Sequence, residues 1–200
     1  DVHIRQTNFI ENPSFLFGRL AGQYQFASGI HVALGYANLL ASPSKSNLKT
    51  WSDEHRIYQQ LTYTSRISKV GLFYRLRNEQ RWREQIDVNA DKWNGSYVFT
   101  NRIRYLMSMN FPLSKSKNKS ALVLADEVFV QLGPSIIYNT FDQNRLFIGY
   151  KQNVSKSISF DIGYMRVFQQ KSSGNQYDLN HTIRLFFYGN FKANRTSSAI

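Results

Sequence analysis

Charged and apolar residues alternate strictly in the middle of the chain, and this alternation limits the possible folds more than any other feature. Within residues 72–82 the charged side chains occupy every second position: Arg75, Arg77, Glu79 and Arg81. Residues 102–111 repeat the pattern, with apolar side chains between polar ones. A strand places successive side chains on opposite faces, whereas a helix would scatter these charges around its axis. The pattern therefore predicts strands with one charged and one apolar face.

The same period extends along most of the chain. We expect strands at 15–26, 30–37, 53–64, 70–82, 97–113, 121–133, 144–154, 158–170 and 179–191, with an alternating segment at 1–6 before them. Longer polar connections near residues 8, 46, 90, 137 and 175 alternate with shorter ones near 28, 67, 117 and 155. Such alternation is typical of up-and-down strands that run between two unlike compartments.

Two local predictions are specific enough to test. Residues 83–96 are expected to form a long polar loop. If the turn after residue 64 pairs positions whose numbers sum to 135, Arg56 faces Glu79 and Glu54 faces Arg81, while apolar side chains meet on the other face.

Composition favours lipid as the surroundings of the apolar face. The hydrophobic share is 42%, yet the mean hydropathy is −0.43, so apolar residues are interspersed with polar ones. No window approaches the roughly 18 apolar residues of a spanning helix, whereas a barrel strand needs only about 9 to 11. A soluble barrel would share the alternation, but the apolar face here is rich in tyrosine near strand ends, as in aromatic girdles. We predict an all-β, antiparallel up-and-down transmembrane β-barrel of about ten strands (8–12), with residues 1–191 as one domain and 192–200 as a polar tail.

This fold assigns each strand residue to one side. The predicted lumen-lining residues are Glu54, Arg56, Arg75, Arg77, Glu79, Arg81, Arg102, Arg104, Glu127, Arg145 and Arg184. The predicted lipid-facing residues are Leu61, Tyr63, Leu72, Tyr74, Ile103, Tyr105, Met107, Leu146, Ile148, Ile183, Leu185 and Phe187. Long arginine side chains would occupy most of so narrow an interior.

The net charge of +12 calls for anionic surroundings. Loop cations could meet lipopolysaccharide phosphates: Lys45, Lys49, Arg83, Lys92 and Lys171. The chain has no cysteine, which excludes disulfides and thiolate sites, and no histidine pair has metal-ligand spacing, so no cofactor is expected. It starts at Asp1 without an apolar signal segment, so any export signal is expected outside these residues.

Several blocks, in order, resemble an uncharacterised Gram-negative outer-membrane barrel family, the domain of unknown function 2490. They lie at 53–60, 75–82, 101–105, 126–129, 141–146 and 180–183. The strand that ends at the aromatic Phe191 also resembles the carboxyl-terminal signature of outer-membrane barrels, although nine polar-tail residues follow it. The resemblance implies a small barrel in the outer membrane with a periplasmic C-terminus. It implies no activity, and it carries over no catalytic residue.

Three functions are compatible with these observations. The first is a non-enzymatic barrel, either a structural or accessory subunit of an outer-membrane assembly or a narrow, largely plugged pore that prefers anions. The second is a lipid-modifying enzyme, for which His55 and His181 are candidates near Ser52, Asp53 and Asp178, though no spacing indicates a catalytic triad. The third is a soluble basic all-β protein that binds nucleic acid through arginines and aromatics. The carboxylates that share a face with these arginines disfavour the third, so no nucleic-acid partner is expected.

Overall fold

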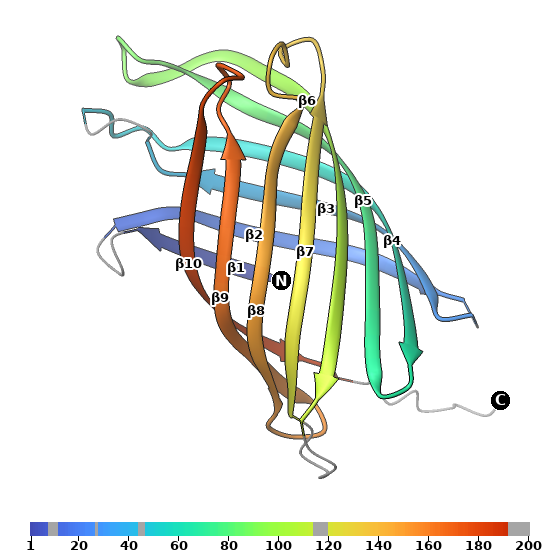
Figure 1. Cartoon of the computed structure of the whole chain (residues 1–200). Helices are drawn as coiled ribbons and strands as arrows, with labels where there is room; N and C mark the ends of the chain where they lie inside the picture. The colour runs from blue at the N-terminus through green and yellow to red at the C-terminus, as the bar shows by residue number, and fades with distance from the viewer. Residues whose placement is uncertain (8–11, 27, 44–46, 114–119, 192–200) are drawn as a thin grey trace, which may run out of the picture.

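The protein folds into a single antiparallel sheet of ten strands, seen in a computed structural model that describes residues 1–7, 12–26, 28–43, 47–113 and 120–191 (Figure 1). The strands are β1 (Val2–Thr7), β2 (Asn12–Gln25), β3 (Ile30–Ala41), β4 (Ser52–Ile67), β5 (Val70–Asp87), β6 (Lys92–Pro112), β7 (Ser120–Leu132), β8 (Phe141–Asn153), β9 (Ile158–Gln170) and β10 (Tyr177–Gly189). Each strand pairs with the next in the sequence. The predicted all-β, up-and-down architecture of about ten strands is thus confirmed. The predicted tail at 192–200 lies outside the described residues.

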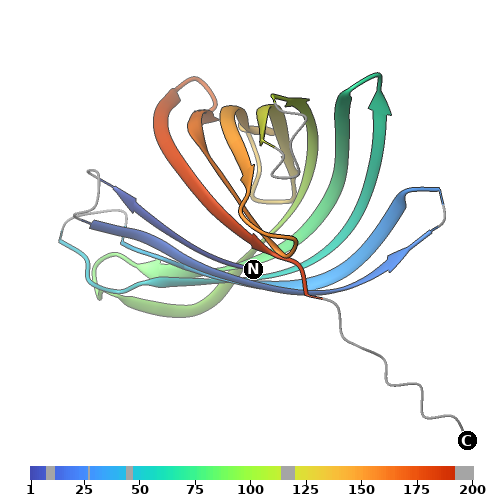
Figure 2. The same ribbon diagram turned by 90° about the horizontal axis from the view of Figure 1, so that it is seen from below.

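The sheet curls on itself, so that β7–β10 stand opposite β1–β3 (Figure 2). Its first and last strands approach closely enough for side-chain contact. Arg5 Nη2 on β1 lies 3.5 Å from Thr182 Oγ1 on β10, and the rings of His3 and Phe186 lie 4.6 Å apart. The result is a half-barrel with a concave and a convex face.

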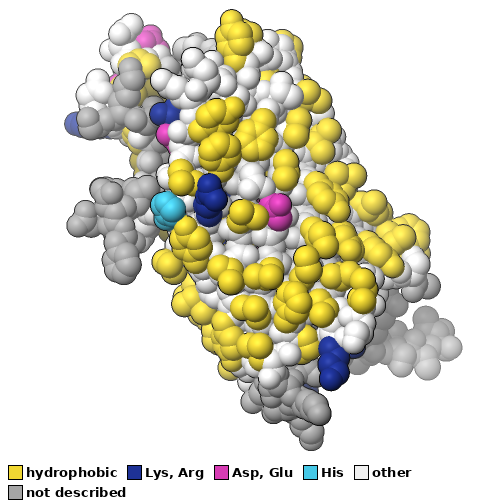
Figure 3. All heavy atoms as spheres, in the orientation of Figure 1, with side chains coloured by type: hydrophobic (Ala, Val, Ile, Leu, Met, Phe, Trp, Pro, Cys, Tyr) yellow, Lys and Arg dark blue, Asp and Glu magenta, His cyan; other side chains and the backbone are white. Residues whose placement is uncertain are grey.

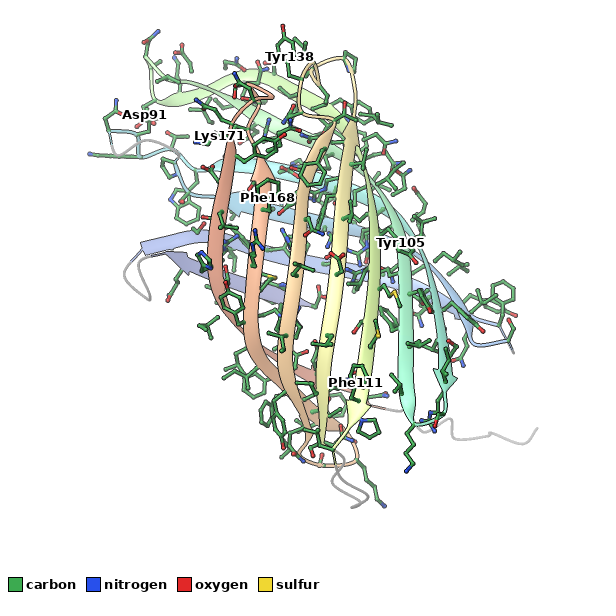
Figure 4. All side chains as sticks on the ribbon, viewed as in Figure 1. Asp91, Tyr105, Phe111, Tyr138, Phe168 and Lys171 are labelled. Atoms are coloured by element: carbon green, nitrogen blue, oxygen red, sulfur yellow. The ribbon has the colours of Figure 1, made fainter. Side chains whose placement is uncertain are left out.

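The connections lie at two ends, as the up-and-down order requires. Asp91, Tyr138 and Lys171, from three different connections, lie toward one end, whereas Phe111 lies toward the other (Figure 4). We call the first the long-loop end and the second the short-turn end. Among the described residues, none forms a helix long and apolar enough to cross a membrane.

The long polar loop predicted at 83–96 is wrong, because most of it is strand. β5 continues to Asp87 and β6 begins at Lys92, so the two strands form a hairpin that runs past the pairing of β4 with β5, which stops at Arg83. Polar residues can extend a hairpin in this way because backbone hydrogen bonds, not an apolar face, hold it together.

The predicted register of β4 with β5 is shifted by two residues. The strands meet in a two-residue turn, where Ile67 pairs with Val70 and Ser68 has a φ of 53°. Arg56 consequently faces Arg81, and Tyr58 faces Glu79. A shift of two keeps every side chain on its predicted face, whereas a shift of one would have exchanged the faces.

Burial differs sharply between the two faces. The concave face holds buried apolar residues such as Phe17, Ala37 and Tyr58, together with buried charges. On the side seen in Figure 3, the convex face is covered with apolar side chains. The described sheet therefore has a charged concave face and a convex face that is largely apolar on the side seen in Figure 3.

Candidate functional site: the charged interior

The candidate site is the network of charged side chains on the concave face. Pairing places all eleven predicted lumen residues on this face, because Arg56 faces Arg81, Arg77 faces Arg104 and Glu127 faces Arg145. Alternation then brings the remaining members to the same side.

Glu79 on β5 is the centre of the network. Its carboxylate accepts hydrogen bonds from Arg102 Nη2 at 2.6 Å and from Arg104 Nη1 at 2.7 Å, both on β6. Arg77 Nη1 lies 3.5 Å from the same carboxylate. Glu79 and Arg77 are each only 2% exposed, so this charge cluster is nearly sealed from solvent.

Two further carboxylates extend the network across the sheet. Glu54 accepts from Arg56 Nε and from Arg81 Nε, each at 2.6 Å. The predicted pairing of Glu54 with Arg81 therefore exists, although the two residues are diagonal and not directly opposite. Arg56 pairs with Glu54 on its own strand and not, as the predicted register implied, with Glu79.

Glu127 on β7 connects three strands. Its Oε1 accepts from Arg104 Nε on β6 at 2.9 Å and from Arg75 Nη2 on β5 at 2.7 Å. Arg75 thus reaches past β6 to β7. Because each carboxylate serves two or more arginines, removal of one acid would leave several cations unpaired.

Sequence reasoning missed two buried acids of the interior. Asp142 accepts from Arg102 Nη1 at 3.1 Å, and Asp161 accepts from Arg184 Nη2 at 3.1 Å and from the Tyr188 hydroxyl at 2.6 Å. Alternation alone would have found Asp161, which lies between apolar positions of β9. Asp142 sits beside a β-bulge in the pairing of β7 with β8, and a bulge interrupts the simple period.

Aromatic rings support the guanidinium groups. Phe129 is fully buried, and the guanidinium carbons of Arg102, Arg104 and Arg145 lie 5.3, 4.4 and 4.6 Å from its ring centroid. Tyr58 receives Arg77 at 4.6 Å. Cations over aromatic faces gain electrostatic stabilisation that strengthens when water is excluded.

Arginines outnumber buried carboxylates on this face by two to one. Its buried or half-buried arginines are Arg5, Arg19, Arg56, Arg75, Arg77, Arg81, Arg102, Arg104, Arg145 and Arg184; its carboxylates are Glu54, Glu79, Glu127, Asp142 and Asp161. Among the described residues, Arg5 and Arg145 have no carboxylate partner: Arg5 bonds to Thr182, and Arg145 Nε bonds to Gln143 at 3.1 Å. The Nε atoms of Arg75 and Arg184 are buried without an acceptor. An enclosed excess of this kind favours anions.

The two candidate histidines both contact tyrosine. His55 Nδ1 lies 2.6 Å from the Tyr36 hydroxyl, and His181 Nδ1 bonds to the hydroxyl of Tyr164. His55 also lies 3.6 Å from Asp53. Within the described ranges, no three His, Cys, Asp or Glu side chains gather into a group that could hold a metal ion.

The residues predicted to face lipid lie on the convex face. Ile183 is 69% exposed and Phe187 is 70% exposed, whereas Leu72 on the same face is only 8% exposed. Lipid contact itself stays a prediction for all of them.

Fold and site together define an all-β protein whose curled sheet encloses an ion-paired, arginine-rich interior. The chain belongs to the protein family of unknown function DUF2490, whose family model matches residues 1–178. This confirms the family expected from the resemblance. No curated protein and no solved structure matches the chain.

Proposed function

We propose that this protein is a non-enzymatic outer-membrane β-barrel, a structural or accessory subunit whose arginine-rich lumen is largely plugged. One observation carries the proposal: the sheet buries the charges at the centre of its concave face and exposes apolar side chains on its convex face. Arg77 and Glu79 are nearly enclosed, while the convex face presents exposed leucine, isoleucine and phenylalanine along β8–β10. A water-soluble protein gains stability from the opposite distribution, whereas hydrocarbon favours this one.

The two ends of the sheet fit the two sides of an outer membrane. Short turns are typical of the periplasmic side and longer loops of the outer surface. On this assignment the described chain ends on the periplasmic side, since Gly189 of β10 pairs with Ile158 beside the short turn after β8.

The long-loop end would then contact lipopolysaccharide. Lys49, Lys92 and Lys171 are exposed in or beside the connections of this end, and Arg83 is exposed on β5. Lys45, predicted with them, lies outside the described residues. Ammonium and guanidinium groups bind phosphate through charge-assisted hydrogen bonds.

The contacts between interior side chains favour a plugged barrel over an open channel. Arg75 spans β6 to reach Glu127, and Arg102 links Glu79 on β5 to Asp142 on β8. Any ion that passes would meet unneutralised arginines, so a residual conductance would prefer anions.

The proposal is tested by expressing the protein with an export signal in a Gram-negative host. We expect it in the outer-membrane fraction, with a faster gel band before boiling than after, because folded barrels resist unfolding by detergent at room temperature. Co-purification from native membranes would then identify assembly partners. Recovery as a detergent-free soluble protein without a heat-dependent gel shift would refute the proposal.

A further inference from the structure

Charged side chains cross the convex face of β7–β10. Pairing sets Asp126 on β7 opposite Leu146 on β8, Leu146 opposite Arg166 on β9, and Arg166 opposite His181 on β10. We call Asp126 and Arg166, together with the polar His181 beside Arg166, the charged row. Figure 3 shows cationic, anionic and histidine side chains midway along this face, with apolar side chains on either side.

The charged row does not lie at the rim of the apolar surface. On β10, Leu179 precedes it and Ile183 and Leu185 follow it, and all three are exposed. On β8, Ile148 lies exposed on the side of the short turns. The charges are therefore enclosed by the surface that the proposed function places in lipid.

Intramolecular contacts leave the row incompletely paired. Arg166 is exposed and, within the described part of the chain, has neither an ion pair nor a hydrogen-bonding partner for its guanidinium. Asp126 Oδ1 accepts from Asn144 Nδ2, and the second oxygen of Asp126 forms no described hydrogen bond. A charge on the lipid-facing side of a barrel is destabilising, most strongly near the middle of the bilayer. A protein surface that supplies the missing partners would remove this cost.

The arrangement of the row is complementary to itself. Asp126 and Arg166 lie on either side of Leu146, one strand away each, which separates their Cα atoms by roughly 10 Å. We propose that the face of β7–β10 is the contact surface between two copies of this chain, related by a two-fold axis beside Leu146. Such an axis sets Arg166 of each copy against Asp126 of the partner subunit, and the pair forms twice. Apolar residues around the row would pack around these ion pairs.

The inference rests on the proposed function, because only a hydrocarbon environment makes the incompletely paired charges of Asp126 and Arg166 destabilising. Membrane insertion and dimerisation are nevertheless measured separately. A heat-modifiable protein in the outer membrane that stays monomeric would retain the proposed function and refute the dimer.

Charge reversal tests the two symmetric contacts in lipid nanodiscs, with mass measured on the intact particles. Arg166→Asp and Asp126→Arg should each weaken dimerisation about tenfold or more, because each places like charges together twice. A one-to-one mixture of these two variants should form a heterodimer, since opposite charges then meet at both contacts. The double variant R166D/D126R should dimerise like the wild type. Arg66→Asp, an exposed position at the short-turn end, is the matched control and should have no effect.

Cysteine crosslinking tests the position of the axis, and the absence of native cysteine makes it unambiguous. Leu146→Cys should form a disulfide-linked dimer when copper(II) phenanthroline takes two electrons from the two thiols, which release two protons. Leu61→Cys on β4 is the control, because Leu61 and Leu146 are both 43% exposed. Every variant must first show the heat-dependent gel shift of a folded barrel.

Three results would overturn the inference. The first is a wild-type protein that stays monomeric in nanodiscs, which would also be the result if a different protein covers this face in the cell. The second is dimerisation of the two charge-reversal variants to the same extent as the wild type. The third is crosslinking of Leu61→Cys as efficient as that of Leu146→Cys.

Discussion

Arg102 donates two hydrogen bonds to one oxygen of Glu79, from Nε at 3.0 Å and from Nη2 at 2.6 Å. Both side chains are buried, and they belong to adjacent strands whose pairing places them directly opposite. The contact fixes β5 against β6 through the interior as well as through the backbone. Since Glu79 also binds Arg104, the interior depends heavily on one carboxylate.

Glu79→Gln should therefore destabilise the fold strongly. The substitution removes the counter-charge of several buried guanidinium groups, and a buried pair that loses one partner costs about 3–5 kcal/mol. Unfolding by urea in lipid vesicles would measure the loss. Asp178→Asn is the control, because Asp178 and Lys171 form an exposed pair worth at most about 1 kcal/mol. Equal stabilities for the two variants would contradict the central role of Glu79.

Gly163→Ala should also destabilise the protein. A Cβ at position 163 would lie 2.2 Å from the Ile148 carbonyl oxygen and 2.5 Å from the Gly149 Cα, so the backbones of β8 and β9 would have to separate. Overpacking of this kind costs about 1–3 kcal/mol. Gly22→Ala, where a Cβ meets nothing within 4 Å, should change the unfolding free energy little. A Gly163→Ala protein as stable as Gly22→Ala would show that the strands separate freely.

Asp91 should make the long-loop end sensitive to pH. Its carboxylate accepts the backbone N–H groups of Lys49 at 2.9 Å and Thr50 at 3.1 Å, and these bonds lower the pKa of Asp91 below its ordinary value. A lowered pKa means that the stabilisation is present above the unfolded-state pKa, about 4, and is lost as pH falls through the folded-state pKa.

Hydrogen exchange of the Lys49 and Thr50 amides would measure this contact. Their protection should fall as the pH drops below about 4, once intrinsic exchange rates are corrected. Asp91→Asn keeps a side chain that tolerates the positive φ of 46° at this position but removes the charge. The pH-dependent loss of amide protection should therefore disappear in this variant. Identical pH profiles for the two proteins would refute the role of the carboxylate.

Removal of large side chains from the interior should open an anion-selective channel. Phe129→Ala with Arg145→Gln removes a buried ring and one of the arginines that stack on it, while the ion pairs of Glu79 stay intact. We expect the wild type to conduct little in planar bilayers and the double variant to conduct more. The remaining arginine excess should shift the reversal potential in a KCl gradient toward that of chloride. A cation-selective current would contradict the predicted lumen charge.

Alternation in the sequence was sufficient to predict about ten strands and the sheet face of each predicted lumen residue, but it missed the strand segments within 83–96. Strand period is a local property: once Arg75 points inward, Arg77, Glu79 and Arg81 must follow. Arg166 and Asp126 show the limit of this rule, because they lie on the convex face, where alternation predicts apolar side chains at their positions. The membership of the chain in its family followed from the order of whole blocks and needed no structure.

Only the tertiary structure decided which charges meet. The two-residue turn at Ser68 sets the register of β4, and the bulge beside Val130 brings Asp142 to Arg102. Curling of the sheet brings Arg5 to Thr182, residues at opposite ends of the chain. A sequence period fixes the side of a strand on which a residue lies. The residues that it faces on the neighbouring strands depend on turn geometry, bulges and curvature, which arise when the strands pair.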